Sequence, residues 1–119
     1  MIKKAIEQAK KSVDFKHRLG AVITDKRNNV LSSGFNIKKT HPMQAKYSRS
    51  NEHCYLHAEI AALVRCRGEA YNIYVARVSK QNKLRLAKPC KYCMAAILES
   101  DIKNIYFTNN KGKVERLGL

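Results

Sequence analysis

Apolar residues recur at steps of three and four along the first thirteen positions of the chain. This helical spacing predicts an amphipathic helix over residues 2–13 that packs its apolar side against a core. The apolar stretches 21–24 and 30–33 are strand-like, and five polar residues separate them. Because Asn28 and Asn29 in this separating segment tolerate positive φ, the two stretches are predicted to form a β-hairpin.

Helical and strand-like patterns alternate in the second half of the chain. Helices are predicted at residues 56–66 and 90–100, and strands at residues 73–78, 84–87 and 105–108. Strands that alternate with helices favour an α/β fold with at least one parallel crossover connection. A single domain covering residues 1–119 has room for these elements and for a hydrophobic core.

Residues 35–55 show no clean period and are rich in polar side chains. Irregular segments of this length are uncommon in compact domains, and they often carry function. We therefore expect a functional loop between the predicted hairpin and the helix at residues 56–66.

Composition limits the class of protein. The longest apolar run, Ile60 to Val64, is too short to span a membrane, and the basic N-terminus lacks the apolar segment of a signal peptide. Four cysteines without an export signal are better explained as thiols or metal ligands than as disulfides. We therefore expect a cytoplasmic protein without a membrane partner.

The chain is strongly basic, with 24 Lys and Arg residues against nine Asp and Glu residues and a formal net charge of +15. Such an excess raises the local concentration of nucleotides and polyanions, although it also serves solubility alone. The charge fits a phosphate-bearing substrate, which is either a nucleotide or a nucleic acid. Charge by itself does not separate these two.

The main chemical motif is His57-Ala58-Glu59, followed downstream by Pro89-Cys90 and Cys93. One imidazole and two thiolates form a ligand set expected of a zinc site that keeps one coordination position open. Glu59 suits a general acid and base beside such a site. Neither part is specific alone, because an H-x-E triplet is common by chance and a C-x-x-C pair also occurs in redox proteins.

The spacing places both parts of the motif at predicted helix starts. Cys90 and Cys93 are three residues apart, so both sulfurs can point to one side of a first helical turn. The helix N-terminus also favours the thiolate form. His57 and Glu59 are only two residues apart and do not share a helix face, so they can serve one pocket only if the metal lies over the helix end.

Two other arrangements of metal ligands are open. In a structural zinc module that binds nucleic acid without catalysis, a fourth ligand would close the site, and Cys54, His53, Cys66 and His41 are the candidates. Alternatively, His41, His53 and Cys54 would hold a second zinc in the polar loop. Ordinary polar loop residues explain these three side chains more simply.

With these residues in place, the chain resembles the cytidine and deoxycytidylate deaminase superfamily, and is nearest to the deoxycytidylate and tRNA adenosine deaminase branches. The signature H-x-E followed by P-C-x-x-C is that of zinc-dependent nucleobase deaminases. The resemblance extends from residues 19–36 through both motif segments to residues 102–107. It implies a three-layer α/β/α cytidine deaminase-like fold with a mixed five-stranded sheet and both zinc-bearing helices on one face.

The resemblance also implies roles for individual residues. His57, Cys90 and Cys93 would hold one zinc per chain, and Glu59 would take a proton from the attacking water and pass it to the base and the leaving ammonia. The backbone amides of Ala58 and Cys90 would flank the reacting oxygen.

The segment Gly34-Phe35-Asn36 resembles the part of these relatives in which an asparagine contacts the nucleoside. Asn36 is therefore a candidate for substrate binding, while an asparagine that ends a strand in a turn is an equally good explanation. The chain departs from its relatives at Lys88, where many have Glu or Ser before the Pro-Cys pair. It also departs in the segment 79–87, where many pass directly from the strand into the motif.

We predict a zinc-dependent hydrolytic deaminase that converts a cytosine-type base to uracil. Residues 35–55 resemble the longer loop of the deoxycytidylate branch, which favours a free (deoxy)cytidine nucleotide such as dCMP. The alternative substrate is cytosine or adenosine within single-stranded DNA or tRNA. A homo-oligomer is compatible with these patterns.

Overall fold

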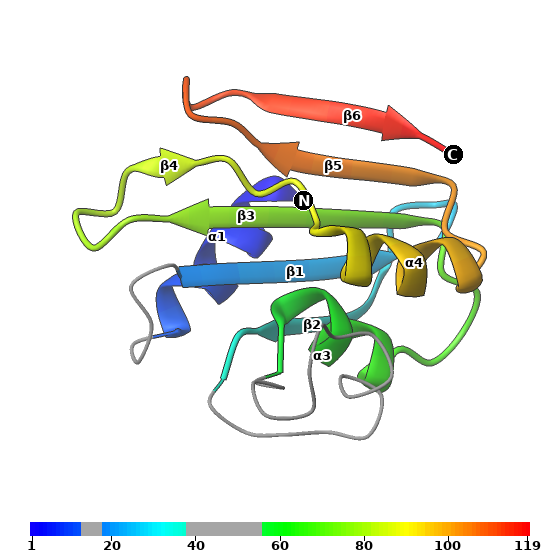
Figure 1. Ribbon diagram of the computed structural model, residues 1–119. Helices are drawn as coiled ribbons and strands as arrows, with labels where there is room; N and C mark the ends of the chain where they lie inside the picture. Colours follow the sequence, from blue (N-terminus) through cyan, green and yellow to red (C-terminus); the bar gives the residue numbers. More distant parts are fainter. Residues whose placement is uncertain (13–17, 38–55) are drawn as a thin grey trace.

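The computed structural model describes residues 1–12, 18–37 and 56–119 of the chain (Figure 1). The helices and strands are α1 Ile2–Lys11, β1 Arg18–Thr24, β2 Val30–Phe35, α3 Ala58–Arg65, β3 Asn72–Val78, β4 Leu84–Arg85, α4 Lys91–Glu99, β5 Asn104–Thr108 and β6 Val114–Gly118. None of the helices in these described ranges is both long enough and apolar enough to cross a bilayer.

The strands form one mixed sheet in the order β2-β1-β3-β5-β6, with the short β4 paired to β3 outside this path. The β3 and β5 strands are parallel, and α4 lies in the connection between them. The other pairs, including β5 with β6, are antiparallel. The mixed α/β fold predicted from the sequence is confirmed, and the sheet has six strands instead of five because β6 adds to the five strands that the sequence predicts.

The sheet separates two helical layers. The α1 helix covers one face, and α3 and α4 lie together on the other face (Figure 1). On the α1 face, Ala5 packs with Val22 and Ala76. On the opposite face, Ile73 and Val75 pack with helix residues that include Ala58 and Ile97. The predicted placement of both motif-bearing helices on one face is therefore confirmed.

The β1–β2 hairpin has the turn chemistry that its sequence predicts. Asn28 adopts a φ of 67°, in the left-handed region that asparagine tolerates. The carboxylate of Asp25 accepts hydrogen bonds from the backbone N–H groups of Arg27 and Asn29, each at 2.9 Å. This Asx-type network fixes the turn that directs β2 back along β1.

The first helix is shorter than predicted. It ends at Lys11, because Ser12 leaves the helical conformation with φ −81° and ψ 102°. The Ser12 hydroxyl donates a 2.8 Å hydrogen bond to the carbonyl of Asn36. This bond ties the end of α1 to the end of β2, so the helix stops where its last residue meets another strand.

Candidate metal centre

The two halves of the sequence motif occupy the starts of α3 and α4. His57 is the N-cap of α3 and Cys90 is the N-cap of α4. Glu59 and Cys93 follow within the first turn of the two helices. A side chain in a first turn can reach over the helix end, which is the condition that the two-residue spacing of His57 and Glu59 imposes.

The helix starts bring three possible metal ligands together. One imidazole nitrogen of His57 and the sulfur atoms of Cys90 and Cys93 all lie within 4.8 Å of one another. The Nδ1 atom of His57 is 3.3 Å from the Sγ atom of Cys93. Within the described ranges, these residues form the one group of three or more His, Cys, Asp or Glu side chains that could hold a metal ion.

The environment of the cluster favours a thiolate at Cys90. Contacts with the Cys93 and His57 side chains, aided by backbone amides at the start of α4, lower the Cys90 pKa to about 3. The His57 pKa is raised, chiefly by its hydrogen bond with Cys90. Hydrogen bonding to Cys90 and burial raise the pKa of Cys93. The start of α4 therefore favours the thiolate form of Cys90, which is the form of cysteine that binds a metal ion.

Glu59 is buried beside this cluster, with 4% of its surface exposed. Burial raises the pKa of its carboxyl group above the ordinary value. Its Oε1 atom is buried and has no hydrogen-bond partner among the described residues. A buried polar atom without a partner costs stability, so this oxygen lies where a further polar group is needed.

Zinc fits this donor set. A nitrogen and two sulfur ligands complete three of the four tetrahedral positions and leave one open. The unpartnered Glu59 oxygen lies beside that cluster, as a proton-transfer group for a catalytic site should. A closed structural site would leave this buried oxygen without a role.

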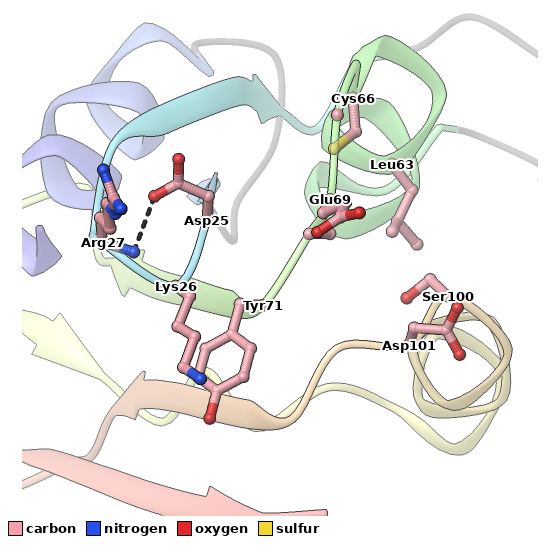
Figure 2. Close-up of a pocket in the computed structure, with 11 residues that line it drawn as sticks. Asp25, Lys26, Arg27, Leu63, Cys66, Glu69, Tyr71, Ser100 and Asp101 are labelled. Atoms are coloured by element: carbon pink, nitrogen blue, oxygen red, sulfur yellow. Dashed lines mark hydrogen bonds between the residues drawn. The ribbon is translucent and has the colours of Figure 1, made fainter.

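Of the candidate fourth ligands, the structure describes Cys66, and it does not bring this residue to the site. Cys66 follows the last residue of α3, about 12 Å along the helix from its start. It lines an open pocket of about 710 Å³ at the far ends of both helices, where Figure 2 shows it near Leu63 and across from Asp25. His41, His53 and Cys54 lie outside the described residues, as does the predicted loop from residue 38 to residue 55.

The two predicted substrate-binding residues are both buried. Ala58 is the first residue of α3 and is fully buried, so its backbone N–H lies at the helix start. Asn36 follows β2, and its Oδ1 atom accepts a 3.0 Å hydrogen bond from the backbone N–H of Leu19. This bond matches the alternative explanation of Asn36 as a residue that fixes the backbone at a strand end.

Sequence reasoning missed a contact between the end of β2 and the residue before His57. The neighbouring Ile37 forms an antiparallel bridge with Leu56, and its N–H donates to the Leu56 carbonyl at 3.0 Å. The bridge places the end of β2 beside the residue that precedes His57. No local pattern signals this bridge, because the two residues are separated by the whole polar loop.

Comparison with known proteins gives a family and a fold. The sequence model of the cytidine and deoxycytidylate deaminase zinc-binding region matches residues 1–109. Among curated proteins, none matches this chain significantly.

Solved structures share the fold at low sequence identity. The dCMP deaminase from the cyanophage S-TIM5 in its apo form is 21% identical, with a TM-score of 0.64 over 91% of this chain and 79% of that chain. The same enzyme in complex with dCMP and dUMP is 20% identical, with a TM-score of 0.64 over 93% and 82%. Acinetobacter baumannii RibD is 20% identical with a TM-score of 0.55, and the match covers 91% of this chain but 26% of RibD.

Proposed function

The chain belongs to the cytidine and deoxycytidylate deaminase family with its zinc-binding region, and from this premise we propose that it hydrolyses a cytosine-type base to uracil. In this reaction the oxygen of a water molecule bonds to C4 of the ring, the C4–N bond breaks and ammonia leaves. The zinc, when bound, supplies the Lewis acidity that makes water nucleophilic near neutral pH.

The observation that carries this proposal is the buried Oε1 atom of Glu59 beside three metal-ligand candidates. His57, Cys90 and Cys93 are the proposed zinc ligands. A structural role would not place a carboxyl group without a partner at this point, because the unsatisfied oxygen is destabilising. A proton carrier needs that oxygen unoccupied until water and substrate arrive.

Glu59 is the proposed proton carrier. Its carboxylate accepts a proton from the attacking water and delivers it to the ring nitrogen, and it assists the departure of ammonia. Burial raises the pKa of Glu59, so the group can hold the transferred proton at a pH where an exposed glutamate would release it.

Backbone and side-chain groups at the helix starts would orient the reaction. The N–H groups of Ala58 and Cys90 lie at or beside the N-termini of α3 and α4, where amides are available to an oxygen that gains negative charge. Asn36 is proposed to contact the nucleoside, and the bridge from Ile37 to Leu56, which joins the neighbours of Asn36 and His57, supports this role. Its hydrogen bond to Leu19 would fix its orientation.

The proposed minimal substrate is a free (deoxy)cytidine nucleotide such as dCMP. The net charge of +15 favours a phosphate-bearing molecule over a nucleoside. One solved structure with the same fold is named a dCMP deaminase and holds dCMP and dUMP.

A substrate panel tests this function. Zinc-loaded protein is incubated with dCMP, cytidine, single-stranded DNA and tRNA, and the products are analysed for uracil, hypoxanthine and ammonia. The proposal expects dUMP and ammonia in equal amounts from dCMP. Hypoxanthine from tRNA without uracil from the other substrates would contradict the assignment to cytosine.

A further inference from the structure

The connection between β3 and α4 is basic throughout. No acidic residue occurs from Ala70 to Leu98. The same stretch holds six cations, which are Arg77, Lys80, Lys83, Arg85, Lys88 and Lys91. The last two flank the Pro-Cys pair, so the basic segment ends at the metal centre.

The first part of this connection forms an ordered hairpin with β3. The hairpin consists of β3, the turn at residues 79–83 and β4. The Ser79 N–H donates to the Lys83 carbonyl at 2.9 Å, and the Ser79 Oγ accepts from the Lys83 N–H at 3.2 Å. Arg18, from β1, donates to the Asn82 Oδ1 at 3.0 Å. The turn therefore presents its cations from a fixed backbone.

The return strand of the hairpin is held against β5. The Thr108 hydroxyl, which is fully buried, donates to the Arg85 carbonyl at 2.7 Å. The Ala87 N–H donates to the Thr108 carbonyl at 2.8 Å, and the Leu86 N–H donates to the Asn110 side chain at 2.9 Å. These bonds fix the path from the hairpin into Pro89 and Cys90.

Two arginines of the hairpin are direct cross-strand neighbours. Arg77 in β3 is paired with Arg85 in β4. Side chains alternate along a strand, and Ile73 and Val75 pack into the core under α3 and α4. Arg77 and its neighbour Arg85 therefore lie on the same face of the sheet as the metal-bearing helices, and both are half-buried.

Like charges that are directly opposite on neighbouring strands destabilise a sheet. Each guanidinium group donates to a backbone carbonyl of the hairpin, Arg77 to Leu86 at 3.5 Å and Arg85 to Leu84 at 3.3 Å. A phosphate beside this pair would lower the repulsion between the two charges, and phosphate suits the fork geometry of arginine. Along the chain, the exposed Lys80 and Lys83 precede Arg85 and the exposed Lys88 follows it, so the basic residues form a row along the segment.

The length of the row indicates more than one phosphate. At about 3.3 Å per residue, the extended segment from Lys83 to Lys88 covers roughly 16 Å. An ion pair requires a nitrogen–oxygen distance of about 4 Å or less. A single phosphate group cannot satisfy the whole row, whereas successive phosphates of a strand can.

We propose that the β3–β4 hairpin binds the phosphate backbone of a single-stranded nucleic acid beside the target base. The inference rests on the proposed function, because that function places the target base at the metal centre. It extends the substrate from the minimal nucleotide to an oligonucleotide, whose flanking phosphates lie along Arg77, Arg85 and the neighbouring lysines.

The test measures binding of the full chain to a fluorescent single-stranded oligothymidylate, which contains no base to deaminate, at several salt concentrations. For single strands the salt slope changes by about 0.7 per phosphate contact. The double variant Arg77→Gln with Arg85→Gln should therefore lower the slope by about 1.4. The matched control Lys3→Gln with Lys4→Gln removes the same charge from α1, on the opposite face of the sheet, and should change it less.

Two further variants separate charge from folding. Arg77→Lys with Arg85→Lys keeps both charges and should retain most of the slope. Lys80→Gln with Lys83→Gln changes two exposed positions and should also reduce the salt slope. This variant keeps the proposal testable if the arginine variant does not fold. Equal slopes for all hairpin variants and the α1 control would overturn the proposal.

Activity distinguishes this proposal from the proposed function. The ratio of kcat/KM for a cytosine-containing oligonucleotide to that for dCMP should fall about tenfold in the hairpin variant and stay constant in the α1 control. If the chain turns over dCMP but the hairpin variants change neither the kcat/KM ratio nor the salt slope of binding, the hairpin proposal alone is contradicted. Hairpin-dependent binding without deamination of any substrate contradicts the proposed function alone.

Discussion

The Nδ1 atom of His57 lies 3.3 Å from the Sγ atom of Cys93, although 36 positions separate the two residues in the sequence. The contact joins the start of α3 to the first turn of α4, two helices on the same face of the sheet. A metal held here would cross-link segments that the chain brings together only when the sheet between them has formed. Metal binding and folding are therefore expected to be coupled.

Cys93→Ala should abolish zinc binding. The unaltered chain should hold about one zinc, and loss of a buried thiol leaves two ligands, which are too few for a stable site. Metal content by elemental analysis of purified protein checks this. Cys66→Ala is the matched control, because Cys66 lies at the other end of α3, and it should keep the zinc. A metal-free chain that deaminates dCMP would contradict the zinc assignment.

Glu59→Gln should keep the zinc and lose turnover. The amide has nearly the same shape as the carboxyl group but cannot carry the proton, and general acid–base catalysis contributes about 10²–10⁴-fold. The measurement is kcat with dCMP, alongside zinc content and thermal unfolding. Glu7→Gln on α1 removes an equal charge from an exposed position and should leave kcat unchanged. Turnover of the Glu59 variant within tenfold of the unaltered chain would exclude Glu59 as the proton carrier.

Gly34→Ala should destabilise the contact between β2 and α3. A Cβ atom at Gly34 would lie 2.7 Å from the Ala61 Cβ and 2.9 Å from the Ala62 backbone nitrogen. Because neither neighbour can rotate away, the helix must shift, and overpacking of this kind costs about 1–3 kcal/mol. Chemical denaturation gives the free energy of unfolding.

Gly118→Ala is the matched control for Gly34→Ala. Its added Cβ would meet only a side-chain nitrogen of Arg116 at 3.8 Å, which is ordinary contact. We expect a change within about 0.5 kcal/mol. Equal stability of the two glycine variants would show that α3 adjusts freely against β2.

Asp25→Ala should lower the melting temperature at neutral pH, and the difference should vanish in acid. Hydrogen bonds from the backbone and side chain of Asn29, together with the backbone of Arg27, lower the Asp25 pKa below its ordinary value of 3.8. A carboxyl group with a lowered pKa in the folded state stabilises the fold above its unfolded pKa. That contribution is lost as the pH falls through the folded value.

The measurement for Asp25 is thermal unfolding of both proteins from about pH 7 to about pH 2.5. The difference in melting temperature should be constant down to about pH 5 and then shrink. Taking the difference removes the effect of the other carboxyl groups. A difference that is unchanged at the acid end would mean that the charge of Asp25 does not hold the turn.

Much of the site could be predicted from residue spacing. The His57 and Glu59 pair required a helix end, and His57 is the N-cap of α3 with Glu59 in its first turn. The three-residue spacing of Cys90 and Cys93 required that these residues lie at the start of a helix, and Cys90 is the N-cap of α4, which begins at Lys91. Such local relationships are set by helix geometry, so the sequence is sufficient to predict them.

Features that depend on distant partners could not be predicted. The β6 strand, Val114–Gly118, was missed because two adjacent charged residues interrupt its apolar positions and because the strand is largely exposed. The pairing of Arg77 with Arg85 follows from the register of the hairpin, which a run of basic residues does not define. The Asn36 bond to Leu19 depends on where two strands meet.

The anchoring of Arg85 and Ala87 by Thr108 has a consequence for how the protein can diversify. The hairpin turn lies outside these anchors, while His57, Cys90 and Cys93 lie inside them. Exchange of residues 79–83 should therefore leave in place the groups that we propose to carry the proton and to hold the metal. If the hairpin binds the partner as we propose, a grafted turn should change which partner is bound and leave the deamination chemistry intact.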